Sequence, residues 1–421
     1  MKNKFIIIGI FIAILYSCSS SQNTGGNKNV AGIYMPGLNL IDPTFRVFHK
    51  NDTLSEIYFR LNSSNVLYTK KRSDTIFSAN IIIKYELTDL NSMLLTDSAS
   101  ISFKDFGNNN EKKFLEGTIS LSTLANHSYD LRITITDLTR DHYITKKITL
   151  NRLDIYNTQN FLILDSNKNI AFTNHFKTNE KVYIKMNENN FKNTITLKYY
   201  STDLPIAKPP FSSDTKNKNT TFIPKHTTQL TFDSTNTLTF TIKEQGLYHL
   251  QASESNQSGP TLFSFQEYFP KVLTPENMIG PLRYISTKSE FSALTEAPDK
   301  KIAVDNHWID IAGSKERART LIREYYTRVE NANNYFTSYL EGWKTDRGII
   351  YIIYGSPNVV YKHKGYENWI YGEENNMMSM SFVFNKVANP INNNDYSLTR
   401  SSTYKSSWFR AVDSWRNGRI Y

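Results

Sequence analysis

The stretch from Ser314 to Leu340 has a clear helical periodicity. Its apolar residues recur at steps of three and four, and they are Ala318, Leu321, Ile322, Tyr325, Val329, Ala332, Phe336, Tyr339 and Leu340. This spacing keeps one face of an α-helix apolar for about seven turns. Ser314 can cap the first turn, because its hydroxyl can accept a backbone N–H group there. The pattern predicts one long amphipathic helix around which the last third of the chain is organised.

The residues after this helix predict a stop and then a strand. Gly342 stands where a glycine in the left-handed conformation would end the helix. The segment 343–348 then turns the chain, and Ile349–Tyr354 reads as a strand. Gly355-Ser356-Pro357 makes the next turn.

The surrounding residues predict an α+β domain over 271–421. Thr274-Pro275-Glu276 is a helix start with proline at the first position. Further helices are expected over residues 288–296 and 298–311, and returning strands over residues 367–371 and 378–384. Trp408, Val412 and Trp415, at steps of four and three, predict a terminal helical turn that packs on the sheet.

Two all-β regions precede this domain. Over residues 31–155 apolar side chains alternate with polar ones, as at Ile57, Phe59 and Leu61. Residues 156–270 hold strand-like runs at 161–164, 182–186, 194–200, 229–232, 237–242 and 247–252. This spacing predicts two antiparallel β-sandwiches of immunoglobulin-like type, and we expect them to act as spacers. The stretch 205–225, around Pro209-Pro210, reads as a long exposed loop, for which disorder is favoured over function.

The N-terminus predicts export. Lys2 and Lys4 precede an apolar run from residue 5 to residue 15, which is shorter than the roughly 20 residues that a membrane-spanning helix needs. The run ends Leu15-Tyr16-Ser17-Cys18, which resembles the lipobox of bacterial lipoproteins. The resemblance implies a signal peptide over residues 1–17 and lipidation of Cys18, with palmitate among the acyl groups. The alternative is an incidental cysteine at the end of an ordinary signal peptide.

Residues 18–30 read as the lipidated cysteine and a flexible tether, because polar residues and glycine dominate them. No acidic cluster follows Cys18, so we expect an outer-membrane protein that faces the periplasm. Cys18 is the only cysteine, which excludes disulfides and a cysteine nucleophile in the mature domains.

The composition fits an exported globular protein with several domains. The 421 residues carry a net charge of +10, and the lysines are dispersed as on a solvated surface. Nucleic acid is therefore not an expected partner, whereas weak attraction to anionic lipid or lipopolysaccharide phosphates is consistent with this charge.

The C-terminal residues resemble a known family. Gly342-Trp343-Lys344-Thr345-Asp346 looks like the signature of the GWxTD domain of exported bacterial proteins. The further matching residues, which we take with the signature as the motif and candidate partner-binding set, are Arg347, Gly355, Pro357, Trp369, Tyr371, Trp415 and Arg416. The resemblance implies no established activity. The order Tyr-Gly-x-Pro and then Trp-x-Tyr is also similar to small lipoproteins that accompany the barrel-assembly machine of the outer membrane.

The signature has a structural interpretation and a functional one. In the structural one, Trp343 packs on the following sheet, Thr345 and Asp346 accept backbone N–H groups in a turn, and Asp346 pairs with Arg347 or Arg416. In the functional one, Asp346, Arg347, Glu367 and Arg416 surround a cleft that captures a partner's backbone or a small anionic group.

Catalytic and cofactor motifs are not found. The histidines are scattered without metal-ligand spacing, and the sequence has no nucleophile elbow, P-loop or dinucleotide-binding pattern. We expect no catalytic residue, no metal and no cofactor. The first hypothesis is a non-enzymatic, lipid-anchored scaffold or accessory subunit that binds an envelope protein. The alternative is a glycan-binding or glycan-processing protein that acts through the aromatic and acidic residues of the C-terminal domain.

Overall fold

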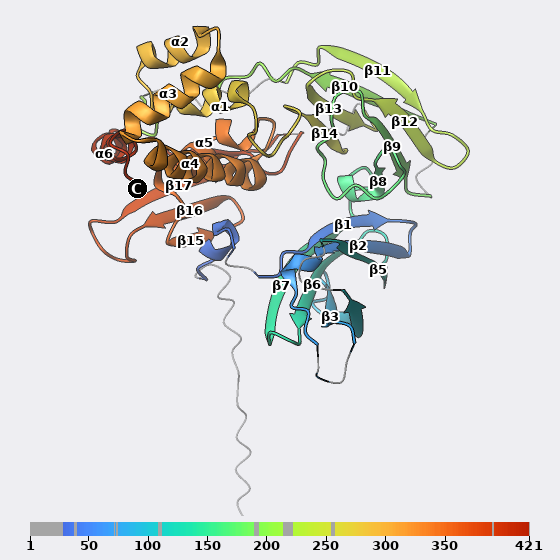
Figure 1. The fold of residues 1–421 in the computed structure, drawn as a ribbon. Coiled ribbons are helices and arrows are strands. Elements are labelled where there is room, and N and C mark those ends of the chain that lie inside the picture. Colours follow the sequence, from blue (N-terminus) through green and yellow to red (C-terminus); the bar gives the residue numbers. More distant parts are fainter. Residues whose placement is uncertain are drawn as a thin grey trace, which may run out of the picture.

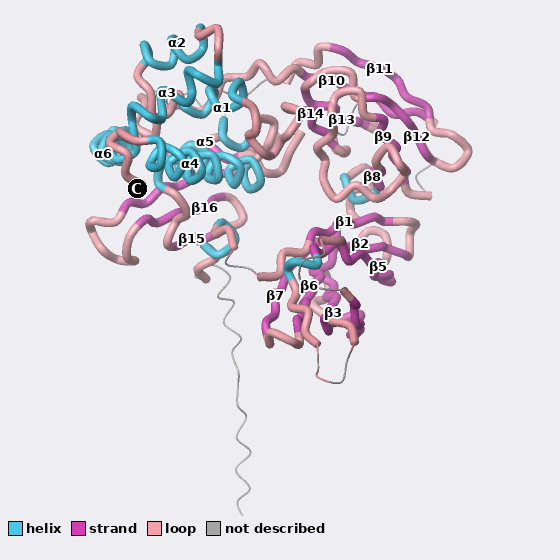
Figure 2. The backbone as a smooth tube through the Cα atoms, viewed as in Figure 1, coloured by secondary structure: helices cyan, strands magenta, loops and turns pink. Residues whose placement is uncertain are grey.

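The computed structural model of the chain describes residues 28–37, 40–70, 72, 75–107, 112–188, 193–213, 222–253, 257–389 and 391–420 (Figure 1). The expected signal peptide, Cys18 and the tether up to residue 27 lie outside the described residues. Figure 2 shows that the long helices gather in the C-terminal part of the chain. Within the described ranges each helix is too short or too polar to cross a bilayer.

The first β-rich part consists of two antiparallel sheets around one core, and we call it the first sandwich. One sheet has the order β1 (Thr44–His49), β2 (Leu54–Asn62), β5 (Phe114–Ser122). The other has the order β4 (Leu95–Phe106), β3 (Ser78–Asp89), β6 (Ser128–Asp137), β7 (His142–Asn151). Ile57, Phe59 and Leu61 all point into the core, as their period of two predicts.

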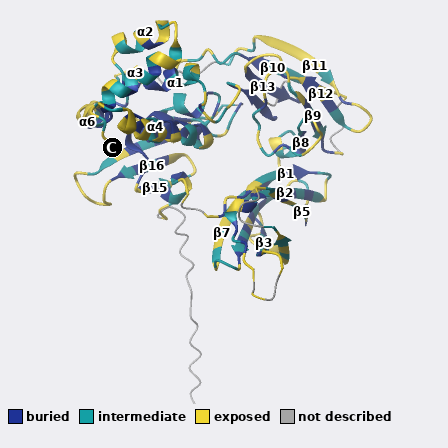
Figure 3. Cartoon of the chain, in the orientation of Figure 1, coloured by how far each residue is buried: buried dark blue, intermediate teal, exposed yellow. Residues whose placement is uncertain are grey.

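The second β-rich part also has two sheets around one core, and we call it the second sandwich. Its sheets have the orders β11 (His226–Thr231), β10 (Thr194–Tyr200), β13 (Gly246–Gln251), β14 (Thr261–Ser264) and β12 (Thr237–Thr241), β9 (Lys181–Met186), β8 (Phe161–Leu164). The six strand-like runs are confirmed, and β11 is exposed along most of its length (Figure 3). Strand β14 was missed because its residues are all buried, which removes the alternation.

The C-terminal part packs helices on an antiparallel sheet. The helices are α1 (Pro275–Leu282), α2 (Lys288–Glu296), α3 (Lys300–Ala312), α4 (Lys315–Phe336), α5 (Asp346–Tyr354) and α6 (Lys405–Arg416). The sheet has the order β15 (Val359–Lys362), β16 (Tyr366–Tyr371), β17 (Met380–Lys386), β18 (Tyr396–Leu398). The short 3-10 turns along the described chain are η1 (Ala31–Tyr34), η2 (Ser63–Asn65), η3 (Thr158–Asn160), η4 (Gly342–Lys344) and η5 (Ser402–Tyr404). As predicted, Thr274 caps α1 and Ser314 caps α4.

The predicted strand Ile349–Tyr354 is wrong, because this segment belongs to helix α5. Thr345 caps the helix by accepting the N–H group of Gly348 at 3.1 Å. Residues 347–354 are all buried, so no polar side marks the helical period. A short apolar run of this kind does not distinguish a buried helix from a buried strand.

The predicted end of the long helix is also wrong. Helix α4 ends at Phe336, and Gly342 is not among the glycines with positive φ. The Thr337 hydroxyl lies at the helix end instead, where it donates to the Asn333 carbonyl at 2.6 Å and accepts the Gly342 N–H at 3.0 Å. This hydroxyl stabilises the turn that the sequence pattern assigned to a left-handed glycine.

Part of the predicted exposed loop 205–225 is docked on the C-terminal part. The Ala207 N–H donates to the Lys344 carbonyl at 2.8 Å, and the Ser401 N–H donates to the Pro210 carbonyl at 3.1 Å. The rings of Phe211 and Phe409 lie 5.3 Å apart. The described residues 205–213 are therefore held in place, while residues 214–221 lie outside the described ranges.

The N-terminal segment 29–34 is docked on the C-terminal part as well (Figure 1). The Val30 N–H donates to the Val360 carbonyl at 2.9 Å, which places this segment against β15. The Tyr34 ring lies 5.1 Å from that of Phe336 and 5.0 Å from that of Trp369. The arrangement thus differs from the expected one, since the sandwiches do not separate the C-terminal part from the N-terminal segment.

Replacing Tyr34 with alanine should destabilise the C-terminal part by about 3–5 kcal/mol, the usual cost of removing a buried aromatic ring. All five tryptophans lie between residues 308 and 415, so tryptophan fluorescence during urea unfolding reports on this part alone. Tyr143→Ala, at an exposed tyrosine of the first sandwich, is the matched control and should leave the transition unchanged. An unchanged transition for Tyr34→Ala would contradict the docking of the N-terminal segment.

Candidate functional site

Gly342 of the signature and Gly348 of helix α5 each allow two backbone segments to approach closely. A Cβ atom on Gly342 would lie 1.8 Å from the Ala332 carbonyl oxygen of α4. A Cβ atom on Gly348 would lie 1.9 Å from the carbonyl oxygen of Gly342. Turn η4 is therefore wedged between α4 and α5, and no larger residue fits at either position without moving the backbone.

Trp343 packs against helix α1 rather than on the sheet. A Cβ atom on Gly280 would lie 2.9 Å from the Trp343 indole, so this glycine makes room for the ring. The backbone N–H of Trp343 donates to Asn333 Oδ1 at 3.2 Å, and the Tyr284 hydroxyl donates to the backbone carbonyl of Trp343 at 2.9 Å. The indole remains half-buried, with the Lys344 ammonium 5.2 Å from its centre.

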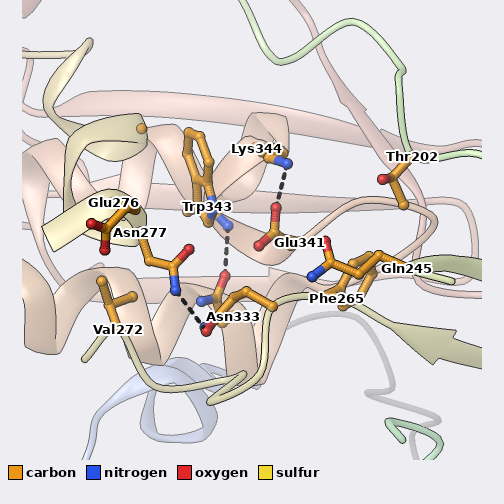
Figure 4. A pocket seen from close by; sticks show the side chains of 12 residues that line it. Thr202, Gln245, Phe265, Val272, Glu276, Asn277, Asn333, Glu341, Trp343 and Lys344 are labelled. Carbon is orange, nitrogen blue, oxygen red and sulfur yellow. Dashed lines mark hydrogen bonds and ion pairs between the residues drawn. The ribbon is translucent and has the colours of Figure 1, made fainter. Parts of the chain in front are cut away.

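A pocket of about 190 Å³ opens beside Trp343, between the C-terminal part and the second sandwich. Figure 4 shows the indole between Glu276 and Asn277 on one side and Lys344 and Glu341 on the other. The remaining wall comes from residues of the second sandwich and the segment that follows it, which are Thr202, Gln245, Phe265 and Gln266. Lys344 and Glu341 form an ion pair at the rim.

Asp346 makes an ion pair that the sequence did not indicate. Both of its carboxylate oxygens contact the Arg400 guanidinium, with Oδ2 at 3.1 Å from Nη1. Oδ2 also accepts the Leu398 N–H at 2.8 Å. Arg400 in turn donates to the Lys208 carbonyl at 3.2 Å, which connects the signature to the docked segment 205–213. The predicted pairing of Asp346 with Arg347 or Arg416 is therefore wrong.

Arg347 forms a buried ion pair with Glu367, and their side chains are 2% and 0% exposed. Arg347 Nη1 lies 3.4 Å from each oxygen of Glu367. Arg347 Nη2 donates to the Asn394 carbonyl at 3.0 Å, and its guanidinium lies 4.0 Å from the centre of the Tyr396 ring. The cation is thus held by a carboxylate, a carbonyl and an aromatic face.

Glu367 has further partners from three directions. The Tyr34 hydroxyl donates to it at 2.9 Å, the Trp369 indole N–H at 3.1 Å and the Lys362 ammonium lies at 3.0 Å. Burial by itself would raise the pKa of Glu367, but Arg347 and Lys362 outweigh burial, so the pKa is lowered. Burial raises the pKa of Tyr34, which keeps its hydroxyl protonated as a donor.

The other predicted site residues lie in the interior, except Arg416, whose side chain is partly exposed. Gly355 has a φ of 83° and its carbonyl accepts the Tyr371 hydroxyl at 2.9 Å, while Pro357 is buried in the following turn. Trp415 is fully buried and donates its indole N–H to the Ile353 carbonyl at 3.1 Å. Arg416 pairs with Glu290 of α2 at 2.7 Å. Asp346, Arg347 and Arg416 thus have separate carboxylate or cation partners, and they do not surround a common cleft with Glu367.

Several residues that complete the site were missed. They are Tyr34, Glu290, Asn394 and Arg400. Tyr34 and Glu367 are 333 positions apart in the chain, so no local pattern could connect them. The capping pair Thr287 and Glu290 is the one available local signal, because a threonine three residues before a glutamate marks a helix start.

A larger cavity of about 560 Å³ lies between the second sandwich and the loop 389–394. Asparagines line much of it, and the side chains of Asn157 and Asn389 are already used to hold turns. Asn389 Oδ1 accepts two N–H groups of its own loop, and Asn157 Oδ1 accepts the Gln159 N–H at 2.8 Å. Across the described ranges, no group of three or more His, Cys, Asp and Glu side chains could hold a metal ion.

Replacing Gly342 with alanine should destabilise the C-terminal part by at least about 3 kcal/mol, because the new methyl group overlaps a backbone carbonyl. Gly365→Ala is the matched control, since nothing lies within 4 Å of its added Cβ, and it should stay within about 0.5 kcal/mol of the wild type. Urea unfolding followed by tryptophan fluorescence measures both. Equal stability of the two variants would contradict the close approach of η4 to α4.

The Glu290–Arg416 pair should make stability depend on pH. The hydrogen bond from Arg416 lowers the pKa of Glu290 to about 2. A lowered carboxyl pKa adds stability above the unfolded-state pKa of about 4.3, and this contribution is lost as pH falls toward 2. Glu290→Gln should therefore be less stable than the wild type at pH 7, and the difference should shrink between pH 4.5 and pH 2. Glu296→Gln, an exposed residue of the same helix, should give no such convergence.

Comparison with solved structures returns fragments of large glycoside hydrolases. A glycosyl hydrolase family 2 member from Bacteroides cellulosilyticus is 11% identical, with a TM-score of 0.20, and the alignment covers 30% of this chain and 15% of that one. A candidate β-galactosidase from Bacteroides fragilis is 6% identical, with a TM-score of 0.19, and the alignment covers 32% of this chain and 20% of that one. Similarity this low supports no conclusion about fold or activity. No curated protein matches the chain.

Comparison with protein families gives a definite result. The sequence profile of the GWxTD domain matches residues 246–417. The match begins at the first residue of β13 in the second sandwich and ends directly after α6. It includes the signature Gly342–Asp346, the buried pair Arg347–Glu367 and both walls of the Trp343 pocket except Thr202 and Gln245. Residues 246–417 of this chain are therefore a GWxTD domain.

Proposed function

We propose that this protein is a lipoprotein, anchored through Cys18 to the periplasm-facing side of the outer membrane. It acts without catalysis, as a scaffold or accessory subunit that binds a protein partner in envelope assembly or secretion. Its β-rich parts are immunoglobulin-like sandwiches in this proposal, and the GWxTD domain supplies the partner-binding surface.

The observation that supports this proposal most directly is how Asp346 of the signature and the adjacent Arg347 are paired. Asp346 binds Arg400, and through it the segment 205–213 of the second sandwich. Arg347 binds Glu367, which also accepts the hydroxyl of Tyr34 from the N-terminal segment. Asp346 and Arg347 thus connect the segment 205–213 and the N-terminal segment to the GWxTD domain. Side chains whose charges are held in such pairs suit a rigid binding module better than they suit proton transfer in general acid–base catalysis.

The Trp343 pocket is the surface that we assign to the partner. Its volume of about 190 Å³ is below the roughly 300–1,000 Å³ of typical small-molecule sites. It suits a single side chain of a partner protein, with the half-buried Trp343 ring as the apolar contact. Glu276 is exposed at the pocket and would give the rim a preference for a basic partner residue.

The glycan alternative depended on the density of aromatic side chains in the C-terminal part. Trp369 and Trp415 are fully buried and Trp408 is 4% exposed, so these rings are not available for stacking on a sugar. Trp343 is the tryptophan that lines the pocket. A glycan that stacks on a tryptophan would bind there, and the experiment below distinguishes it from a protein.

Site-specific crosslinking in intact envelopes tests the proposal. A photo-reactive amino acid in place of Thr202, inside the pocket, should form a crosslink to one envelope protein. The same amino acid in place of Lys301, an exposed residue of α3 away from the pocket, is the control and should not. Adding Glu276→Arg should reduce the Thr202 crosslink several-fold, because it reverses the charge at the rim. Crosslinking to glycan only, or equal products from both positions, would contradict the proposal.

A further inference from the structure

One end of the first sandwich exposes a group of large apolar side chains. They are Ile76 at 58% exposure, Phe77 at 42%, Phe106 at 56%, Leu138 at 50% and Tyr143 at 66%. Single exposed apolar residues are ordinary on a protein surface, but a group of five at one place marks a contact surface.

The strand register brings these residues together. Phe106 is the last residue of β4 and pairs with Ser78, the first residue of β3. The Gly107 N–H donates to the Phe77 carbonyl at 3.1 Å, so Phe77, just before β3, lies beside Phe106 at the end of β4. The Leu138 N–H donates to the Asn80 carbonyl at 3.0 Å. Thr136 pairs with Tyr143 of β7, which completes the row across the sheet.

Basic side chains surround the apolar ones. Lys70, Arg72, Lys104 and Lys112 are exposed at this end. The ammonium groups of Lys70 and Lys104 lie 5.9 Å and 5.2 Å from the ring centres of Phe77 and Phe106. We call this group of described residues the basic–aromatic end.

Among the described residues of this region, the carboxylates leave an excess of positive charge. Asp105 pairs with Lys113 at 2.9 Å. Asp137 is fully buried and accepts the N–H groups of Leu67 and Thr139 at 2.8 Å and 2.9 Å. Asp141 is exposed. The four exposed cations therefore face solvent together with the aromatic rings.

The opposite end of the same sheet has a different charge. It exposes Met93 at 72% and Leu94 at 65%, so it is also apolar. However, it carries the carboxylates of Asp97 on β4 and Asp130 on β6, which pair with Leu87 and Thr88 of β3. Asp89 at the same end is buried and pairs with His127. The two ends thus differ in charge while sharing exposed apolar residues, which makes the acidic end an internal control.

We infer that the basic–aromatic end docks on the surface of an anionic phospholipid bilayer. Aromatic rings favour the boundary between headgroups and acyl chains, because one part of that region is apolar and the other is wet. Lysine and arginine beside them are attracted to anionic headgroups. A row of aromatic and aliphatic side chains within a ring of cations matches both requirements.

The position of the N-terminal segment agrees with this inference. The chain passes from η1 to β1, whose first residue Thr44 pairs with Arg60 near the end of β2. Asn62, the last residue of β2, pairs with Phe114, two residues after Lys112 of the basic–aromatic end. The chain therefore enters the first sandwich near that end. In Figure 1 both η1 and the first sandwich lie on the lower side of the molecule. An anchor attached before η1 would therefore hold this sandwich near the bilayer.

Fluorescence of the full-length chain reconstituted in vesicles tests the inference. An environment-sensitive fluorescent amino acid replaces Tyr143 in one sample and Leu94, at the acidic end, in the other. In vesicles of phosphatidylethanolamine and phosphatidylglycerol, the probe at 143 should shift to the blue and be quenched by nitroxide-labelled lipid. The probe at 94 should do neither. Reversing the charge at Lys104→Glu or Lys112→Glu should weaken the quenching at 143 roughly fivefold or more, and both residues are exposed, so the fold should be kept.

Four results would overturn the inference. They are no response at 143, an equal response at 143 and 94, an unchanged response in phosphatidylcholine vesicles, and a blue shift without vesicles that grows with protein concentration. The last result would assign this end to a second copy of the chain. The inference rests on the lipid anchor of the proposed function, but none of these results bears on the Trp343 pocket, so partner binding there is tested separately.

Discussion

Arg347 and Glu367 form an ion pair whose side chains are almost completely buried, and the arrangement of the GWxTD domain depends on it. Taking two charges out of water costs several kcal/mol for each ion, and this cost is offset only when the pair is close and its remaining hydrogen-bonding groups are satisfied. Here Tyr34, Trp369 and Lys362 satisfy the carboxylate, while Asn394 and an aromatic ring hold the guanidinium. Helix α5, strand β16, the loop before β18 and the N-terminal segment must therefore all be in place at once.

This requirement explains why the signature lies where separate parts of the chain meet. Gly342 and Gly348 let η4 fit between α4 and α5, and Asp346 uses Arg400 to hold the segment 205–213. The pocket beside Trp343 lies within the GWxTD domain except for Thr202 and Gln245, which precede the family match and complete one wall. A rigid junction keeps the pocket walls at a fixed distance, which is what a pocket for a partner's side chain requires.

The sequence predicted the elements of this fold better than their contacts. The cap at Ser314, the helix start at Thr274 and the alternation at Ile57 rest on local rules, and each is confirmed. The run Ile349–Tyr354 was misread because complete burial removes the periodicity that distinguishes a helix from a strand. The partner of Arg347 could not be predicted for another reason, because ion pairs between segments far apart in the sequence leave no local pattern.

The central claim is that the Arg347–Glu367 pair is structural and cooperative. A double-mutant cycle of Arg347→Met and Glu367→Gln, with unfolding followed by tryptophan fluorescence, measures it most directly. Each single variant should lose about 3–5 kcal/mol, because it leaves one buried charge unpaired. The double variant should lose clearly less than the sum, since the second substitution removes a charge that is already uncompensated. Single losses below about 1 kcal/mol, or losses that add within about 0.5 kcal/mol, would contradict the claim.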